Sequence, residues 1–382
     1  MKICVYAICK NESKFLERWM NSLVDEADYI AVLDTGSTDA SYDILDNYSC
    51  NSLFSKDWNH KAKIICDQID IQKELGIMRF DIARNKSKAL VPIDADICFN
   101  IDIDQIPVKG WSDIIMERFR QGYNEVRGDI VDHDENGVEL NRWYSRNVYP
   151  NSPYWIWKRV IHEVIDYFGP DEVKSVYDKR FIIDHYPDPH KDRSLYTELL
   201  YYSCKEFPKD PYYGIHLGID LSRRGQKQEA AEAFRRCLSE CDFTDNLDIE
   251  FQTYLNLAST TDDFKEAITS INNAKSLGIE TRRLYVTCAD IYEAEEDYDR
   301  AIISLEEALT KVKSYSSDWT DDAKNFSGYI EDRLSLFYFY RKHDYLKSIE
   351  YCSKALQLDP DNTRINNNLK FYYKSYIESR GI

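Results

Sequence analysis

The pattern of apolar residues changes once along this chain of 382 residues, near residue 192. Before that point, strand-like apolar runs alternate with helix-like spacings, at Ile3–Ile8, Ser13–Val24, Tyr29–Leu33 and Tyr42–Tyr48. After it, only the helical spacing continues. Alternating strands and helices are typical of a parallel sheet with helical crossovers, whereas a run of helices needs a different architecture. The sequence therefore predicts two domains, residues 1–191 and 192–382.

Small residues recur at regular places in the second half. Ala267, Ala301 and Ser348 stand near the start of predicted helices, and a second small residue follows each after seven positions, at Ala274, Ala308 and Ala355. The spacing of 34 residues between Ala267 and Ala301 is that of a tetratricopeptide repeat. The longer interval before Ser348 contains a polar insertion, residues 313–325. We expect a repeat solenoid that ends in a polar capping helix within residues 361–382; a generic helical bundle is the alternative.

An earlier unit of the same kind contains a glycine and three further residues at small or aromatic positions of the repeat. These are Gly218, Ala230, Phe234 and Cys237.

The first half contains a short apolar run, Ile97–Ile103, that is followed by Asp104 and includes Asp102. Its β-branched residues favour a buried strand, in which Asp102 and Asp104 would face the same side. Two carboxylates at the carboxyl end of such a strand suit Mg²⁺ or Mn²⁺ bound to a diphosphate. Solvated loop acids are the alternative. A second motif, Asp94-Ala95-Asp96, precedes the run, so we assign it to the amino end of the strand.

Polar loops follow three of the predicted strands, after Ile8, after Leu33 and after Ile103. Because ligands of parallel sheets bind beyond the carboxyl ends of the strands, these loops should form one site. A predicted helix, Arg79–Leu90, lies between the second and third of them.

Four short motifs occur together in a characteristic order. They are Lys10-Asn11-Glu12, Asp34-Thr35-Gly36-Ser37-Thr38-Asp39, Ala83-Arg84-Asn85 and Asp102-Ile103-Asp104. In this order they resemble the family 2 nucleotide-sugar glycosyltransferases, most of all the sublancin S-glycosyltransferase-like subgroup, which has C-terminal tetratricopeptide repeats. The resemblance covers roughly residues 1–195, and the repeats extend it to the whole chain. Gln105 departs from the subgroup, which usually has an acid there.

The resemblance implies an α/β GT-A fold, a Rossmann-like mixed sheet, followed by the all-α solenoid. It implies donor contacts from Lys10, Asn11, Asp34, Arg84 and Asp102. Mn²⁺ or Mg²⁺ would be bound by Asp102, Asp104 and His185, and Asp104 would be essential for catalysis. A surface Arg84 paired with Asp81, and a purely structural His185, are the alternatives.

Glu163 follows His162 in a segment, Arg159–Val164, that resembles a His-Glu motif of the same subgroup. A carboxylate there can act as the general base for an acceptor hydroxyl, although another acid could take this role. Aromatic residues are frequent nearby, at Trp111, Trp143, Tyr144, Tyr149, Tyr154, Trp155 and Trp157. They can stack on sugar rings or fill a core.

The predicted function is transfer of a sugar from a nucleoside diphosphate donor, a UDP-hexose, to a peptide, protein or glycan acceptor, with inversion. The repeats would hold the acceptor or a second copy of the chain in a homodimer. A catalytically inactive peptide-binding scaffold and a nucleotidyltransferase are the alternatives. The first turn lacks a glycine-rich basic phosphate loop, which counts against the latter.

The composition limits the classes of binding partner and indicates the cellular compartment. A net charge of −18 argues against duplex nucleic acid or an anionic membrane as partner, since either needs a basic face. Ten cysteines without paired CxxC spacing fit a reducing cytosol. No apolar run reaches the roughly 18 residues of a membrane span, and the apolar N-terminus is too short for a signal peptide. We expect a cytoplasmic protein.

Overall fold

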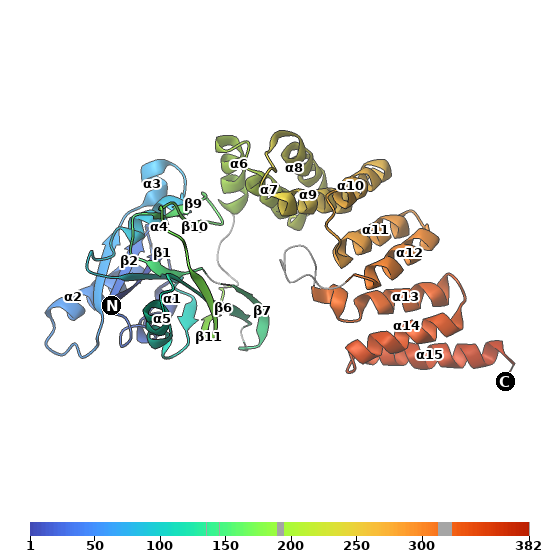
Figure 1. Ribbon diagram of the computed structural model, residues 1–382, viewed down its shortest axis with the longest axis horizontal. Coiled ribbons are helices and arrows are strands. Elements are labelled where there is room, and N and C mark those ends of the chain that lie inside the picture. The colour runs from blue at the N-terminus through green and yellow to red at the C-terminus, as the bar shows by residue number, and fades with distance from the viewer. Residues whose placement is uncertain (135, 145, 189–194, 312–322, 382) are drawn as a thin grey trace. The chain divides into compact units, whose positions relative to one another are not determined.

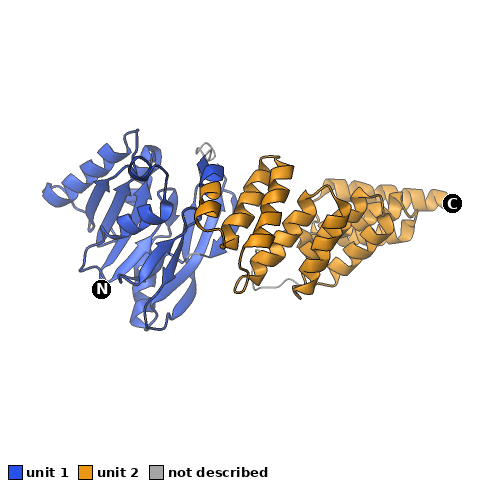
Figure 2. Cartoon of the chain, turned by 90° about the horizontal axis from the view of Figure 1, so that it is seen from above, with its two compact units in different colours: residues 1–199 blue, residues 200–382 orange. Residues whose placement is uncertain are grey.

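The computed structural model describes residues 1–134, 136–144, 146–188, 195–311 and 323–381. The chain divides into two compact units, residues 1–199 and 200–382 (Figure 2). Helix α6 (Leu195–Glu206) contains the division. The predicted boundary, between residues 191 and 192, lies outside the described residues. No helix among the described residues is long and apolar enough to cross a membrane.

The first unit is built on a mixed sheet (Figure 1). Its strands, in spatial order, are β3 (Lys63–Gln68), β2 (Tyr29–Asp34), β1 (Ile3–Cys9), β4 (Ile97–Asn100), β8 (Val148–Pro150), β6 (Glu125–His133), β11 (Ser175–His185) and β5 (Gln105–Pro107), and β7 (Glu139–Tyr144) pairs with β6. The pairs from β3 to β4 are parallel, as is β6 with β11, and the other pairs are antiparallel. A separate hairpin consists of β9 (Trp155–Lys158) and β10 (Val164–Tyr167). The sheet is mixed, as the GT-A expectation required.

Helices cover this sheet. They are α1 (Ser13–Asn21), α2 (Ser41–Phe54), α3 (Ile71–Leu75), α4 (Phe80–Lys88) and α5 (Trp111–Arg120). Strand β1 is buried on both faces, which explains its continuous apolar run. Val5 lies in a cluster with Trp19 of α1 and Trp111 of α5, whereas Tyr6 lies in a second cluster with Trp155 of β9.

The apolar run after Ala95 is a shorter strand than the sequence predicts. Strand β4 ends at Asn100, and a turn follows in which the Asp102 N–H donates to Gln105 Oε1 (3.1 Å) and the Gln105 N–H donates to the Asp102 carbonyl (3.0 Å). Gln105 then begins β5, which pairs antiparallel with β11. The prediction of one strand through Ile103 is therefore wrong, because Gln105 closes a turn there.

The second unit consists of antiparallel helix pairs. They are α7 (Pro211–Arg223) with α8 (Lys227–Glu240), α9 (Leu247–Thr260) with α10 (Phe264–Ser276), α11 (Arg282–Ala294) with α12 (Tyr298–Leu309), and α13 (Tyr329–Tyr340) with α14 (Tyr345–Leu358). A short 3₁₀ turn, η1 (Ala323–Phe326), precedes α13. The polar insertion predicted at residues 313–325 lies largely outside the described residues.

The predicted small positions are buried in these helix pairs. Ala267, Ala301 and Ser348 are each the fourth residue of the second helix of a pair and are at most 3% exposed. The residues seven positions later, Ala274, Ala308 and Ala355, are fully buried. A side chain in place of Gly218 would collide with the ring of Phe234, so this position must stay small. The repeat prediction is confirmed.

The last helix, α15 (Thr363–Ser379), packs on α14 through Ile365 and Tyr372. Its outer surface is less polar than the sequence suggests, because Phe371, Tyr373 and Ile377 are between 46% and 50% exposed. The helix lies where the polar capping helix was predicted, and most of its other exposed residues are polar, such as Arg364, Asn366 and Lys370.

Candidate active site

The polar loops predicted to share a site lie at one edge of the parallel part of the sheet. Strands β1, β2 and β4 run parallel, so the loops that follow Cys9, Asp34 and Asn100 leave the sheet at the same edge. Asn11 and Asp102 lie in two of these loops, and Asp34 ends β2 at the start of the third. The sequence argument for a common site after the strands is consistent with this arrangement.

Asp34 is the last residue of β2 and is fully buried. Its Oδ1 accepts hydrogen bonds from the Gly36 and Ser37 N–H groups (3.0 and 2.9 Å) and from Gln68 Nε2 (3.1 Å). Gly36 has φ +100°, and a side chain there would be strained and would press on Asp70. Asp34 Oδ2 is buried without a hydrogen-bond partner among the described residues. Because a buried carboxylate oxygen is normally paired, Oδ2 is a candidate acceptor for a ligand donor group.

Asn11 joins the loop after β1 to the loop after β2. Its backbone has φ +56°, a left-handed conformation that asparagine tolerates better than most residues. Its N–H donates to Ser37 Oγ (2.8 Å), and its Oδ1 accepts from the Thr38 N–H (2.7 Å). Asn11 therefore shapes the turn that holds Asp34. Lys10, the other donor-binding prediction in this loop, is half-buried beside it.

Arg84, on α4, is buried and forms contacts with three polar partners. Its Nη1 lies 2.8 Å from Asp102 Oδ1 and donates to Asn100 Oδ1 (3.1 Å), and its Nε and Nη2 both lie 2.7 Å from Glu163 Oε1. The guanidinium also lies 5.0 Å from the centre of a Trp157 ring. Burial disfavours the charge of Arg84, but Asp102 and Glu163 outweigh this and raise its pKa. Arg84 thus connects two predicted site carboxylates.

The alternative for Arg84, a surface cation paired with Asp81, is wrong. Asp81 binds Arg79 instead, through Nε (3.0 Å) and Nη2 (2.8 Å). Arg84 lies on the buried side of α4 with Ala83 and Ser87, where it reaches the end of β4.

Asp104 and His185 meet where β5 pairs with β11. Asp104 Oδ2 lies 3.4 Å from His185 Nε2, and the other ring nitrogen, Nδ1, lies 2.6 Å from Asp132 Oδ1 on β6. Burial of the ring opposes its protonation, but the hydrogen bonds and charges of Asp104 and Asp132 outweigh this and raise the pKa of His185. The Asp132 bond orients the imidazole so that Nε2 faces Asp104.

Asp104 and His185 bring together a carboxylate and an imidazole, two common types of metal ligand. Carboxylate oxygens suit Mn²⁺ and Mg²⁺, and Mg²⁺ is commonly held by one or two carboxylates together with phosphates and water. A carboxylate on the far ring nitrogen is what ligating histidines usually have. Asp102, the third predicted ligand, binds Arg84 rather than joining this pair. Among the described residues, no three His, Cys, Asp or Glu side chains are arranged to hold a metal.

Glu163 stands at the end of an unusual loop between β9 and β10. Arg159 and His162 both have positive φ values, +72° and +54°. Non-glycine residues adopt such values only where the surroundings hold them. The Val160 carbonyl accepts from the Phe80 N–H (3.0 Å), which attaches the loop to the start of α4. The loop thus fixes Glu163 against Arg84.

The other Asp-x-Asp motif lies at the opposite end of β4. Asp96 Oδ2 accepts from the Lys2 N–H (2.7 Å), and Asp94 Oδ2 accepts from Lys2 Nζ (2.6 Å) and from the Tyr29 hydroxyl (2.9 Å). These contacts join the starts of β1, β2 and β4. Its assignment to the amino end of the strand is confirmed.

Three residues of the site were not predicted from the sequence. Asp132 contacts His185, and Asn100 contacts Arg84. Asn85 exchanges two hydrogen bonds with the backbone of Trp157 (2.8 and 3.0 Å). Asn85 was part of the Ala83-Arg84-Asn85 motif, so a signal existed for it. The contacts of Asp132 depend on strand pairing with a segment 53 residues later, which the sequence does not reveal.

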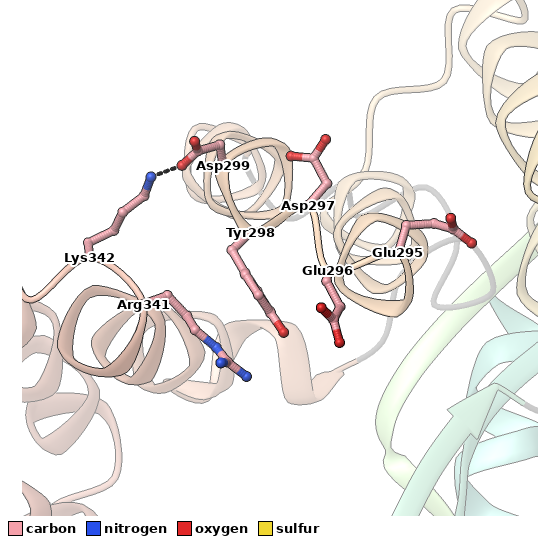
Figure 3. Close-up of a pocket in the computed structure, with 7 residues that line it drawn as sticks. All are labelled: Glu295, Glu296, Asp297, Tyr298, Asp299, Arg341 and Lys342. Atoms are coloured by element: carbon pink, nitrogen blue, oxygen red, sulfur yellow. Dashed lines mark ion pairs between the residues drawn. The ribbon is translucent and has the colours of Figure 1, made fainter.

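The second unit contains a separate acidic pocket of about 430 Å³ (Figure 3). It is lined by Glu295, Glu296, Asp297, Tyr298, Asp299, Arg341 and Lys342. Lys342 forms an ion pair with Asp299, and the Arg341 guanidinium lies 4.1 Å from the centre of the Tyr298 ring. No residue of this pocket was predicted as a site residue.

Comparison with protein-family models gives a match to the tetratricopeptide repeat over residues 283–310, the segment of α11 and α12. No glycosyltransferase family model matches. No curated protein sequence matches the chain.

Comparison with solved structures gives weak similarities to several proteins. The MamA protein is 17% identical, with 44% of this chain and 83% of that chain covered and a TM-score of 0.34. A thermophilic TPR protein of Thermus thermophilus is 17% identical, with 46% and 88% covered and a TM-score of 0.32. MamA of Desulfovibrio magneticus RS-1 is 18% identical, with 44% and 85% covered and a TM-score of 0.34. The family match and the observed fold together show that this chain joins a mixed α/β sheet unit to tetratricopeptide repeats.

Proposed function

We propose that this chain is a metal-dependent glycosyltransferase with a GT-A catalytic unit, which transfers a hexose from a nucleoside diphosphate donor, a UDP-hexose, to a peptide, protein or glycan. The observation that supports this most is the contact of Asp104 with His185, oriented by Asp132. A second is the buried Oδ2 of Asp34, which has no hydrogen-bond partner among the described residues and suits a donor group of the nucleotide.

Each predicted site residue has a separate role in the proposed reaction. Asp104 and His185 would hold Mn²⁺ or Mg²⁺, which when bound neutralises charge on the departing diphosphate. Asp34 accepts a hydrogen bond from the base or ribose. Asp102, whose side chain is 42% exposed, contacts the ribose while Arg84 holds it in place. Lys10 adds a positive charge near the donor phosphates.

Glu163 is the proposed general base. Its side chain is 14% exposed and is oriented by Arg84. The acceptor oxygen attacks the anomeric carbon, its proton passes to Glu163, and the bond from that carbon to the diphosphate oxygen breaks. This direct displacement inverts the anomeric centre. In this proposal Arg84 positions Asp102 and Glu163, which modifies the direct donor contact that the resemblance implies for Arg84.

The repeats are the proposed acceptor-binding part. Stacked helix pairs form extended surfaces that suit a peptide, and such repeats commonly serve interactions between proteins. The catalytically inactive scaffold remains the competing hypothesis, since it would use the same surface without turnover.

The decisive experiment is a screen of nucleoside diphosphate sugars for hydrolysis by the full chain with and without Mn²⁺. Candidate peptide and glycan acceptors are then analysed by mass spectrometry with the donor that is hydrolysed. We expect metal-dependent release of the nucleoside diphosphate from one donor class. Peptide binding without hydrolysis of any donor would favour the scaffold, and release of pyrophosphate from a nucleoside triphosphate would favour the nucleotidyltransferase.

A further inference from the structure

The aromatic segment at residues 111–180 separates into core and surface residues once the structure is known. Trp111, Trp155 and Trp157 are at most 8% exposed. Trp143, on β7, is instead 37% exposed. Core packing therefore explains three of these four tryptophans and leaves Trp143 without such a reason.

Strand register places Trp143 on the face of the sheet that carries the candidate metal pair. Asn141 pairs with Asp132, and Asp132 pairs with His185, so these three share one face. Trp143 is two residues from Asn141 and lies on the same face, because side chains alternate along a strand. Its ring centre lies 6.0 Å from that of His185, at an angle of 85°.

The neighbouring residue, Tyr144, lies on the other face. It pairs with Asp129, and its ring contacts Tyr177 at 5.5 Å, whose hydroxyl donates to Asp129 (2.9 Å). Tyr144 is 69% exposed. It is therefore an exposed aromatic residue on the same strand that does not face His185.

We propose that Trp143 is the stacking platform for the pyranose ring of the donor sugar, an inference that rests on the proposed function. The hexose is bonded directly to the diphosphate, and the diphosphate would lie at Asp104 and His185. A ring beside His185 is therefore placed to contact the sugar. The flat C–H face of a pyranose packs well on an indole, and among the described residues His185 is the one aromatic contact of Trp143.

The test measures binding of UDP and of UDP-glucose to the full chain by calorimetry with Mn²⁺. Trp143→Ala should weaken UDP-glucose roughly fivefold to tenfold and leave UDP unchanged, since only the sugar loses a contact. Trp143→Phe should keep most of the affinity, and Tyr144→Ala should change neither ligand. Thermal melts of all variants verify that they are folded.

Each other outcome overturns the proposal in a different way. Unchanged UDP-glucose affinity in Trp143→Ala excludes a contact with the sugar. Equal weakening of UDP and UDP-glucose means that Trp143 acts by holding His185. Unchanged donor affinity with a raised acceptor KM means that the acceptor lies on Trp143. Failure of the unmodified chain to bind either UDP or UDP-glucose removes the proposed UDP-hexose function itself, and this inference with it.

Discussion

Two Asp-x-Asp motifs flank the same strand, and they have opposite environments. Asp94 and Asp96 precede β4, have side chains 54% and 55% exposed, and bind Lys2 at the start of β1. Asp102 and Asp104 follow β4; Asp102 binds Arg84 and Asp104, with a side chain only 12% exposed, contacts His185.

The difference shows that strand direction, rather than the motif, decides which acids can belong to a site. At the amino edge the carboxylates fasten neighbouring strands together. At the carboxyl edge, a buried arginine from α4 binds Asp102, and an oriented histidine at the end of β11 contacts Asp104. A comparison of the two motifs by mutation therefore tests the site assignment directly.

The largest expected effect is that of Asp104→Ala. It removes one of the two proposed metal ligands, so donor hydrolysis and transfer should fall below detection, a loss of at least about 10³-fold. Initial rates at saturating Mn²⁺ check this, and circular dichroism verifies the fold.

Asp96→Ala is the matched control for Asp104→Ala, since it removes the second acid of the other motif. Its turnover should equal that of the unmodified chain. An equal loss in both variants would mean that the wrong motif was chosen. Activity that survives EDTA would contradict the metal assignment.

Glu163→Gln comes next. Glutamine keeps an oxygen for Arg84 but cannot take a proton, so transfer to a hydroxyl acceptor should slow by about 10²–10⁴-fold while UDP affinity holds. The loss should be smaller for a thiol acceptor, because a thiolate needs less help. Glu172→Gln, at an exposed position, is the control. A near-normal rate for Glu163→Gln would assign the base to another acid.

Asp132→Asn should have an intermediate effect. The proposed ligand His185 would lose the carboxylate on Nδ1 that fixes its orientation, and metal affinity should fall about 10- to 100-fold. Loss of the free Mn²⁺ signal in electron paramagnetic resonance measures this without an activity assay.

The control for Asp132→Asn is Asp129→Asn, on the opposite face of β6, where the carboxylate binds Arg142 and Tyr177. Its metal affinity should not change. Equal weakening by both variants would mean that β6 had been disturbed as a whole.

Much of the first half of the sheet could be predicted from the sequence, because β1, β2 and β4 are buried on both faces and appear as apolar runs. Strand β11, residues 175–185, mixes buried and exposed positions, and only Phe181–Ile183 forms a short apolar run within it. Strand β7 is exposed throughout and gave no signal.

The site residues also differ in how far the sequence predicts them. Asp34 and Asn11 belong to local turns whose glycine and serine are visible in the sequence. Arg84 was recognised, but its partner Glu163 comes from 79 residues later, so its burial and its pairing could not be foreseen. Asp132 was missed for the same reason, since only the pairing of β6 with β11 brings it to His185.

The smallest expected effect concerns the turn that separates Asp102 from Asp104. Gln105 is 6% exposed, and its Oε1 accepts the Asp102 N–H, so the side chain closes the turn that contains the two acids. Gln105→Ala removes one hydrogen bond, worth about 0.5–1.5 kcal/mol, and should lower kcat/KM roughly twofold to tenfold.

Gln105→Glu sharpens the comparison, since a glutamate oxygen can accept the same N–H and is the residue type that the resembled subgroup usually has. If the turn is what matters, Gln105→Glu should retain a rate within about twofold of the unmodified chain, a smaller change than the loss of one hydrogen bond would produce. Steady-state kinetics at several Mn²⁺ concentrations check both variants. If Gln105→Glu instead falls below Gln105→Ala, the added charge acts on Asp102 and Asp104 directly. The neutral side chain of Gln105 would then matter because it adds no negative charge beside Asp102 and Asp104. Turn geometry would not explain why this motif differs from Asp94-Ala95-Asp96.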